Sequence, residues 1–198
     1  EWADSWDRRR RRKAADCAEM QTALLAAAVL SRMGSPQAPL SEFAKAFASA
    51  RGIRLEPSSA STERGEILLF KRCVTWRVNP MPCRLVAVDK KSGEVIGASY
   101  YNVKKPRAFL SALAVAPEYR GRRIGKLLIA CSVSHMRAAG CEAAELHVLG
   151  VDASPERHGL YTSCGFLGGD PARGGTYRLR LDPTGDYEAR VLSGPSTK

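Results

Sequence analysis

The sequence predicts an α/β protein with a mixed sheet, which follows an N-terminal helical extension. Residues 85–101 contain two short apolar runs on either side of the turn segment 89–93, a pattern typical of an antiparallel hairpin. Beyond the hairpin, strand signals alternate with helix signals, as in proteins whose sheet includes parallel strands. These later segments are the strands 109–115, 145–149 and 176–181 and the helices 124–139 and 155–163.

The composition is that of a globular protein and excludes two other classes. With 44% hydrophobic and 26% charged residues, the 198-residue chain differs from disordered and fibrous proteins. The longest strongly apolar run, Ala23 to Leu30, falls far short of the roughly 20 residues that span a bilayer. We therefore expect no membrane-spanning segment.

The cysteines do not show the pattern of a metal site. The six are scattered without a C-x-x-C pair and do not cluster with the three histidines, whereas zinc sites need close pairs of ligands. We predict no metal, and we expect buried thiols in a reducing intracellular compartment, either the cytoplasm or the mitochondrial matrix after processing. Because the sequence begins at Glu1, we expect a fragment or a processed product.

Positive charge is spread along the chain and is densest near its start. The net charge is +11, and residues 65–198 carry 20 basic and 12 acidic side chains, which suits a phosphorylated cofactor, RNA, or both. Arg8 to Lys13 are six adjacent cations within a predicted arm, residues 1–15. This arm is either a solvated segment or one that binds RNA phosphates or an acidic protein surface.

Two helices are predicted after the arm. The first, at 16–33, is rich in Ala, Leu and Met. The second begins after Ser41, a good N-cap, and ends at Gly52. Phe43 and Phe47 are four residues apart, so we expect them to share one buried face of this helix.

Changes in pattern give the predicted domain boundaries. Residues 57–62, rich in Ser and Pro, are expected to form a surface loop, and the apolar runs at 67–70 and 74–78 are expected to be strands. The segment after Pro183 has the character of a loose end. The predicted parts are the arm 1–15, the helical extension 16–64, the main domain 65–182 and the tail 183–198.

The strands at 109–115 and 145–149 are mostly apolar, and we expect both to be buried on two faces. The turn after the first of them is the most informative segment of the chain. Its glycines let backbone approach a ligand closely, and unpaired N–H groups at a helix start attract phosphate. Four cations, Arg120, Arg122, Arg123 and Lys126, add charge. We therefore predict a pyrophosphate site, although no Gly-Lys-Ser/Thr or Gly-x-Gly-x-x-Gly sequence is present.

This turn resembles the cofactor-binding motif of the GNAT superfamily of acyl-coenzyme A N-acyltransferases. The motif reads Arg/Gln-x-x-Gly-x-Gly/Ala after a strand ending in Val-x-Pro, and the chain has VAP at 115–117 and RGRRIG at 120–125. Arg123 stands where the motif has a glycine that admits the phosphates. Its side chain must therefore point outward or hold the cofactor from the side. The resemblance covers residues 84–181.

A second segment, LYTSCGF at 160–166, is similar to the family's Leu-Tyr-x-x-x-Gly-Phe. In the family this tyrosine, here Tyr161, lies beside the coenzyme A sulfur and protonates the leaving thiolate. A phenol with a pKa of about 10 keeps a proton to donate at neutral pH. The alternative is that Tyr161 and Phe166 simply pack the core.

The resemblance implies an N-acetyltransferase that uses acetyl-coenzyme A and an amine acceptor. The cofactor would lie where strands 107–115 and 145–149 splay apart, with its pyrophosphate in the turn. A deprotonated amine would attack the thioester carbonyl directly, and Tyr161 would act as general acid. The implied cofactor-binding residues are Leu113, Ala114, Val115, Arg120, Gly121, Arg122, Arg123, Ile124, Gly125, Lys126 and Ser154.

Several positions depart from the family pattern. Ser154 and Arg157 replace the asparagine and alanine of Asn-x-x-Ala-x-x-Leu-Tyr, although Ser154 followed by proline still starts a helix well. Strand 109–115 lacks the glutamate that several relatives use as general base. Glu145 or His147 on the next strand is a candidate for this role, directly or through water.

These departures keep a second hypothesis open. The chain could be a catalytically degenerate acetyltransferase-like domain that serves as a structural or RNA-contacting subunit of a large assembly, such as an organellar ribosome. The basic composition and the arginine run favour this alternative, whereas the joint presence of the turn and Tyr161 favours the enzyme.

Overall fold

The computed structural model describes residues 40–74, 78, 81–184 and 186–194. By their internal contacts, the described residues all belong to one compact unit. The predicted arm at 1–15, its cations Arg8 to Lys13, and the predicted helix at 16–33 lie outside the described residues. Within the described part, no helix is long and apolar enough to cross a membrane.

A seven-stranded mixed sheet forms the centre of this unit, in the order β1-β2-β3-β4-β5-β7-β6. The pair β4–β5 is parallel, and each of the other five neighbouring pairs is antiparallel. The prediction of an α/β fold with a mixed sheet is confirmed. The strands are β1 (Ile53–Pro57), β2 (Cys83–Asp89), β3 (Val95–Asn102), β4 (Arg107–Val115), β5 (Ala143–Val148), β6 (Leu167–Asp170) and β7 (Gly174–Arg180).

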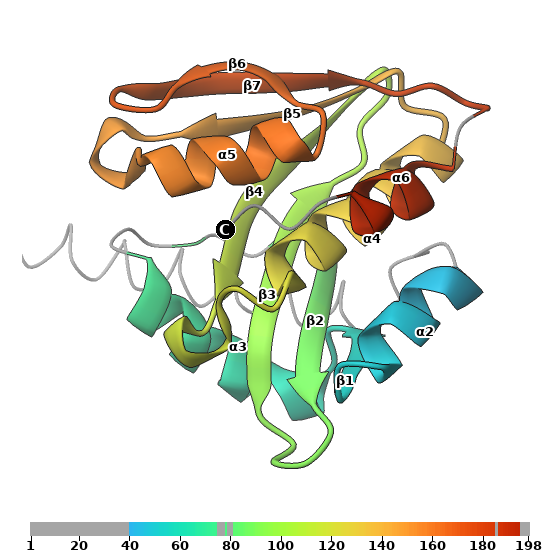
Figure 1. The fold of residues 1–198 in the computed structure, drawn as a ribbon, viewed down its shortest axis with the longest axis vertical. Coiled ribbons are helices and arrows are strands. Elements are labelled where there is room, and N and C mark those ends of the chain that lie inside the picture. The colour runs from blue at the N-terminus through green and yellow to red at the C-terminus, as the bar shows by residue number, and fades with distance from the viewer. Residues whose placement is uncertain (1–39, 75–77, 79–80, 185, 195–198) are drawn as a thin grey trace, which may run out of the picture. The chain divides into compact units, whose positions relative to one another are not determined.

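Helices cover both faces of the sheet (Figure 1). Those of one face pack into a core around α4, with Leu127, Leu128 and Met136 fully buried. The other face is covered by α3, whose Leu69 and Phe70 pack on Tyr100 and its neighbours in the sheet. The described helices are α2 (Glu42–Ser49), α3 (Ala60–Cys73), α4 (Ile124–Ala138), α5 (Pro155–Ser163) and α6 (Tyr187–Ser193), with short 3-10 helices η1 (Pro117–Tyr119) and η2 (Gly150–Asp152).

The local signals that depend on caps and turns are confirmed. Ser41 caps α2, because its Oγ accepts a hydrogen bond from the N–H of Ala44 at 3.1 Å. Ser154 caps α5 in the same way through the N–H of Arg157 at 3.2 Å. The β2–β3 hairpin and the helices α4 and α5 lie where the pattern predicts them, within one or two residues.

The prediction of a strand at 67–70 is wrong, and the predicted loop at 57–62 is confined to residues 58–59. The central residues of the predicted strand at 74–78 lie outside the described residues. Residues 60–73 form α3, and 53–57 form β1 at the edge of the sheet. A capping box between Ser59 and Thr62 starts the helix. A short apolar run does not distinguish a strand from one buried face of a helix, which explains the error. The sheet thus begins within the predicted helical extension.

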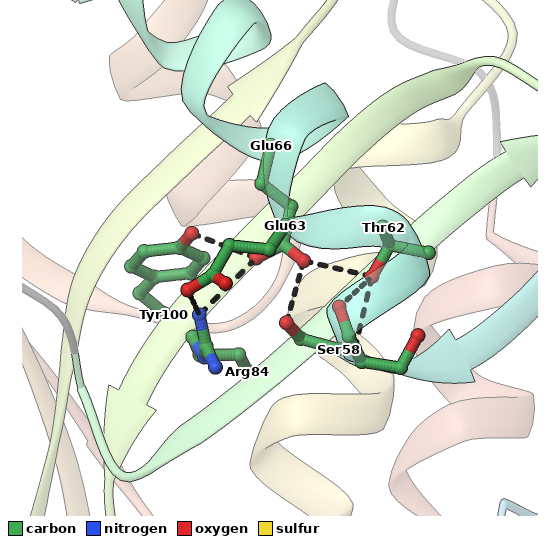
Figure 2. Close-up of polar contacts among 7 residues, drawn as sticks. Ser58, Thr62, Glu63, Glu66, Arg84 and Tyr100 are labelled. Carbon is green, nitrogen blue, oxygen red and sulfur yellow. Dashed lines mark hydrogen bonds and ion pairs between the residues drawn. The ribbon is translucent and has the colours of Figure 1, made fainter. Parts of the chain in front are cut away.

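Glu66 shows why α3 holds its place on the sheet (Figure 2). Its side chain is fully buried, and it accepts hydrogen bonds from Ser58 Oγ at 2.5 Å, Thr62 Oγ1 at 2.9 Å and Tyr100 Oη at 2.7 Å. Arg84 lies 4.0 Å away. Burial and the Glu66 charge raise the pKa of Tyr100, so its hydroxyl remains a donor.

The expected buried face of Phe43 and Phe47 is also wrong. Ala44 and Ala48 are the buried residues of α2, whereas Phe43 is 41% exposed. Phe47 is half-buried, and its ring lies 3.5 Å from Cζ of Arg51. The small alanine side chains let the helix approach the core closely, which a pattern of large apolar residues does not reveal.

Two further corrections concern the strands and the tail. β4 and β5 alternate between buried and partly exposed residues, so they are not buried on both faces as expected. The tail is not a loose end within its described part, because α6 buries Tyr187, Val191 and Leu192 against α4 and the core. The short strand β6 was also missed, since its sequence LGGD has no strand pattern.

Candidate active site

An opening in the sheet results from a bulge in β4 and the end of its pairing with β5. Tyr100 pairs with Ala112 and Tyr101 with Leu110, so Ser111 has no partner on β3. The parallel pairing of β4 with β5 ends at Leu110 and Leu146, although both strands continue. Bulges bend a strand and turn its side chains, and here the bend accompanies the predicted separation of the two strands.

The turn between β4 and α4 exposes a row of backbone N–H groups. Gly121 has φ +78° and Arg123 has φ +65°, and α4 begins at the next residue, Ile124. Among the described residues, no protein acceptor takes the N–H groups of Gly121 to Gly125. This row at the positive end of a 15-residue helix can receive an anion.

A cleft of about 660 Å³ runs from this turn to Tyr161. Residues of β4, of the turn, of the start of α4, of η2 and of α5 line it. Every residue predicted to bind the cofactor lines the cleft except Arg122, whose guanidinium lies 4.9 Å from the ring centre of Tyr119. The predicted residues on the cleft are Leu113, Ala114, Val115, Arg120, Gly121, Arg123, Ile124, Gly125, Lys126 and Ser154.

The side chain of Arg123 points outward from the turn and holds other elements. Its Nη2 donates to the carbonyl of Gly194, and its Cζ lies 5.8 Å from the ring centre of Phe47. Its Nε is buried and has no hydrogen-bond partner among the described residues. Arg123 therefore has the left-handed backbone conformation that glycine adopts freely. Its side chain contacts α2 and the end of α6, which connects the turn to both.

Tyr161 lies at the inner end of the cleft, on α5. It is half-buried, and its ring packs against Tyr177 at 5.3 Å and Phe166 at 6.4 Å between ring centres. Burial raises the pKa of Tyr161 to about 12, with Arg157 opposing the shift. The phenol consequently keeps its proton throughout the neutral range. Tyr161 can therefore pack against these two rings and also donate a proton, because it lines the cleft as well.

A smaller cavity of about 50 Å³, here called the slot, continues from the cleft between β4 and β5. Leu113, Asp152, Arg157 and Tyr161 line both cavities. The walls of the slot are mainly apolar, with Leu110, Ala112, Leu146 and Val148 among them. Because Tyr161 lines both cavities, molecules bound in the cleft and in the slot would both lie next to this residue.

The two candidate bases differ in position. His147 lines the slot, and its Nδ1 lies 3.2 Å from Thr176 Oγ1. Glu145 lines neither cavity, and its carboxylate forms ion pairs with Arg178 at 2.8 Å and Arg107 at 3.6 Å. The structure therefore brings His147, but not Glu145, to the same cavity as Tyr161.

The sequence reasoning missed Asp152 and gave Arg157 no role. Nη1 of Arg157 lies 2.9 Å from Oδ1 of Asp152 and also donates to the carbonyl of Asp152. A signal was present in the sequence, because a cation in the first turn of a helix opposes the helix dipole and calls for a nearby anion.

A family model described as the acetyltransferase (GNAT) family matches residues 50–166. A curated relative, mycothiol acetyltransferase of Propionibacterium freudenreichii subsp. shermanii, is 29% identical over 103 residues, which cover 46% of this chain and 33% of the relative. The chain thus spans about a third of the length of that relative.

Solved structures show the same fold. The NatC complex bound to Gag peptide and CoA contains a chain that is 22% identical with a TM-score of 0.53, covering 65% of this chain and 97% of that one. Phosphinothricin acetyltransferase from Sinorhizobium meliloti, in complex with AcCoA, is 18% identical with a TM-score of 0.53, covering 66% of this chain and 89% of that one.

Proposed function

The chain belongs to the acetyltransferase (GNAT) family, whose acyl donor is acetyl-coenzyme A, and on this premise we propose that it transfers an acetyl group from that donor to an amine by direct attack. The family model covers more than half of the 198 residues. Acetyl transfer in general follows from the family. The use of acetyl-coenzyme A by this chain, the roles of its residues and the kind of amine are our proposals.

One observation carries this proposal: a continuous cleft connects the exposed N–H groups of the β4–α4 turn with the phenol of Tyr161. The pyrophosphate would bind the N–H groups of Gly121 to Gly125, where the helix dipole and Arg120 favour negative charge. The pantetheine arm would follow the edge of β4 that β5 leaves unpaired after Leu110. This arrangement brings the thioester toward Tyr161. The relatives solved with CoA or AcCoA support this choice of cofactor.

In this mechanism the protein positions the amine and the thioester and forms no covalent bond with either. The amine nitrogen attacks the thioester carbonyl carbon, and the carbon–sulfur bond breaks with its electron pair passing to sulfur. Tyr161 gives its proton to the sulfur, and the attacking nitrogen loses one. Held in contact within the cleft and the slot, the two reactants react without a covalent enzyme intermediate.

His147 is the better of the two candidates for accepting the proton of the amine, directly or through water. It lines the slot through which the acceptor would approach, whereas Glu145 is held by two arginines outside both cavities. A neutral imidazole can accept a proton at physiological pH.

The alternative of a catalytically degenerate structural subunit receives no support from the family model or the relatives. The predicted binding of RNA or an acidic protein through the arm remains a prediction, since the arm lies outside the described residues. RNA that co-purifies with the chain and is lost at high salt would favour that alternative.

Thermal unfolding with and without acetyl-coenzyme A tests the proposal. A ligand at 100 times its Kd stabilises a protein by about 2.7 kcal/mol, so a clear rise in Tm is expected. Arg120→Ala removes a cation that lines the cleft and should weaken binding roughly tenfold or more. Arg180→Ala is the matched control, because this arginine is exposed on β7 and lines neither cavity.

Absence of stabilisation in the unaltered chain would contradict the proposal. Equal binding by the Arg120 and Arg180 variants would instead place the cofactor elsewhere. A mass-spectrometric screen of amines for acetylated products would then identify the acceptor.

A further inference from the structure

A charged pair beside Tyr161 has no part in the proposed mechanism. Arg157 precedes Tyr161 by four residues on α5, so both side chains lie on one face of the helix. Both residues line the cleft and the slot, as does Asp152 from η2. A cation and an anion thus stand where the cofactor sulfur and the acceptor would meet.

The guanidinium of Arg157 is fixed at one edge. Its Nη1 binds both the carboxylate and the carbonyl of Asp152, and the Asp152 side chain is only 12% exposed. An arginine has five N–H donors in a planar fork. The described residues accept none of the protons on Nε and Nη2, and the side chain is 39% exposed. Those donors remain available to a molecule in the cavity.

Helix stability does not explain this arginine. It lies in the first turn of α5, where the positive end of the helix dipole disfavours a cation. Ser154 already caps this end, and the family pattern has an alanine at this position. The Asp152 carboxylate offsets part of the positive potential of Arg157 and the helix end, and the remaining donors of the guanidinium can pair with a second anion in the cavity.

We propose that Arg157 stabilises the coenzyme A thiolate as the thioester breaks, with Asp152 holding its guanidinium in place. This inference rests on the proposed function. When the nitrogen–carbon bond has formed and the carbon–sulfur bond breaks, sulfur takes the electron pair and becomes negative. Arg157 pairs with this charge until Tyr161 protonates the sulfur. The proton that His147 takes from the amine returns to the Tyr161 oxygen through water, so protons and electrons balance.

Other ionisable side chains around the two cavities must be separated from this effect. Arg120 is assigned to the pyrophosphate, and Cys73 is itself a thiol, so it is replaced by serine in every protein compared. The other ionisable residues that line the cavities, besides Asp152, Arg157 and Tyr161, are Tyr119, Arg123 and Lys126 from the turn and its flanks, His147 from β5 and Glu156 from α5.

The test measures the affinity of two ligands by calorimetry between pH 7 and pH 10. Coenzyme A carries a thiol that loses its proton in the alkaline range, and its free pKa is measured in parallel, whereas desulfo-coenzyme A lacks the sulfur. In the Cys73→Ser protein, coenzyme A should gain about tenfold in affinity relative to desulfo-coenzyme A as the pH rises, which corresponds to a thiol pKa lowered by one unit. Arg157→Ala should abolish this gain, and Arg157→Lys should keep most of it.

The outcomes separate the inference from the function on which it rests. If Arg157→Ala keeps the gain, Tyr161 and the helix end suffice, and the inference is wrong. If the variant weakens both ligands equally at every pH, Arg157 binds another part of the cofactor, which also overturns it. If the Cys73→Ser protein binds neither ligand, the proposed function itself fails. Thermal unfolding of each variant confirms that it is folded. If the alanine variant does not fold, Arg157→Gln, which removes the charge but keeps a polar side chain, replaces it with the same expected loss of the gain.

Discussion

At the scale of single residues, Tyr161 is the side chain on which catalysis should depend most. It lies where the cleft and the slot meet, and its hydroxyl has no hydrogen-bond partner among the described residues. Tyr161→Phe keeps the ring packing and removes the proton, so we expect kcat to fall by about 10²- to 10⁴-fold with little change in the KM for acetyl-coenzyme A. Steady-state kinetics measure both constants.

Tyr177→Phe provides the matched control for this substitution. Its ring packs against Tyr161, but its hydroxyl binds His158 Nδ1 at 3.0 Å and does not line the cleft. We expect turnover close to that of the unaltered protein. A Tyr161→Phe protein with unchanged kcat would remove Tyr161 from the mechanism.

The pH dependence of the rate follows from the same environment. Burial disfavours the charged phenolate and raises the pKa of Tyr161 to about 12. The group therefore stays protonated as the pH rises through 10, and kcat should not decline up to that pH on its account. A declining limb near pH 10 that disappears in Tyr161→Phe would show that the phenol ionises at its ordinary pKa.

Sequence reasoning at this scale succeeded where a contiguous motif carried the information. The turn residues and Tyr161 lie in two short segments, and the structure brings both to one cleft. Arg122 and Glu145 lie outside it, because their directions depend on a stacking contact with Tyr119 and on ion pairs across strands. Such tertiary contacts leave no local pattern.

At the scale of elements, α3 is held to the sheet by a buried polar cluster as well as by apolar packing (Figure 2). Its last residue, Cys73, lines the cleft, so the placement of the helix matters to the site. Glu66→Ala leaves Tyr100 and two other donors without their acceptor in a buried setting. We expect the free energy of unfolding to fall by about 3–5 kcal/mol in urea denaturation.

Glu63→Ala, one turn earlier on α3, is the control for this change. Its carboxylate lies 3.5 Å from Arg84 but is half exposed, so its loss should cost less than about 1 kcal/mol. Equal costs for the two substitutions would mean that the cluster does not anchor the helix.

Two elements escaped prediction for physical reasons. The apolar residues 67–70 predict a strand, because four consecutive apolar residues fit a strand or a helix equally well. The packing of α3 on β2 and β3 decides for the helix. The sequence of α6 predicts a loose end because the helix is short and polar in part. Its Tyr187 hydroxyl donates a hydrogen bond to the carbonyl of Cys164 at 2.6 Å. The carbonyl of Gly194, just after the helix, accepts a hydrogen bond from Arg123. The helix therefore connects both segments that line the cleft.

At the scale of the whole molecule, the site exists because the sheet opens at one point. The parallel pair β4–β5 separates after Leu110 and Leu146, beside the bulge at Ser111. The resemblance to the family implied this opening, and the order of elements agrees with it, since the turn follows β4 and α5 follows β5 (Figure 1). The acceptor could not be predicted, because the slot is shaped by contacts among distant segments.

The structure of the chain with bound coenzyme A tests the central claim most directly. We expect the pyrophosphate oxygens within hydrogen-bond distance of the N–H groups of Gly121 to Gly125, and the sulfur in contact with the Tyr161 hydroxyl. Coenzyme A bound away from the β4–α4 turn, or with its sulfur remote from Tyr161, would contradict the account.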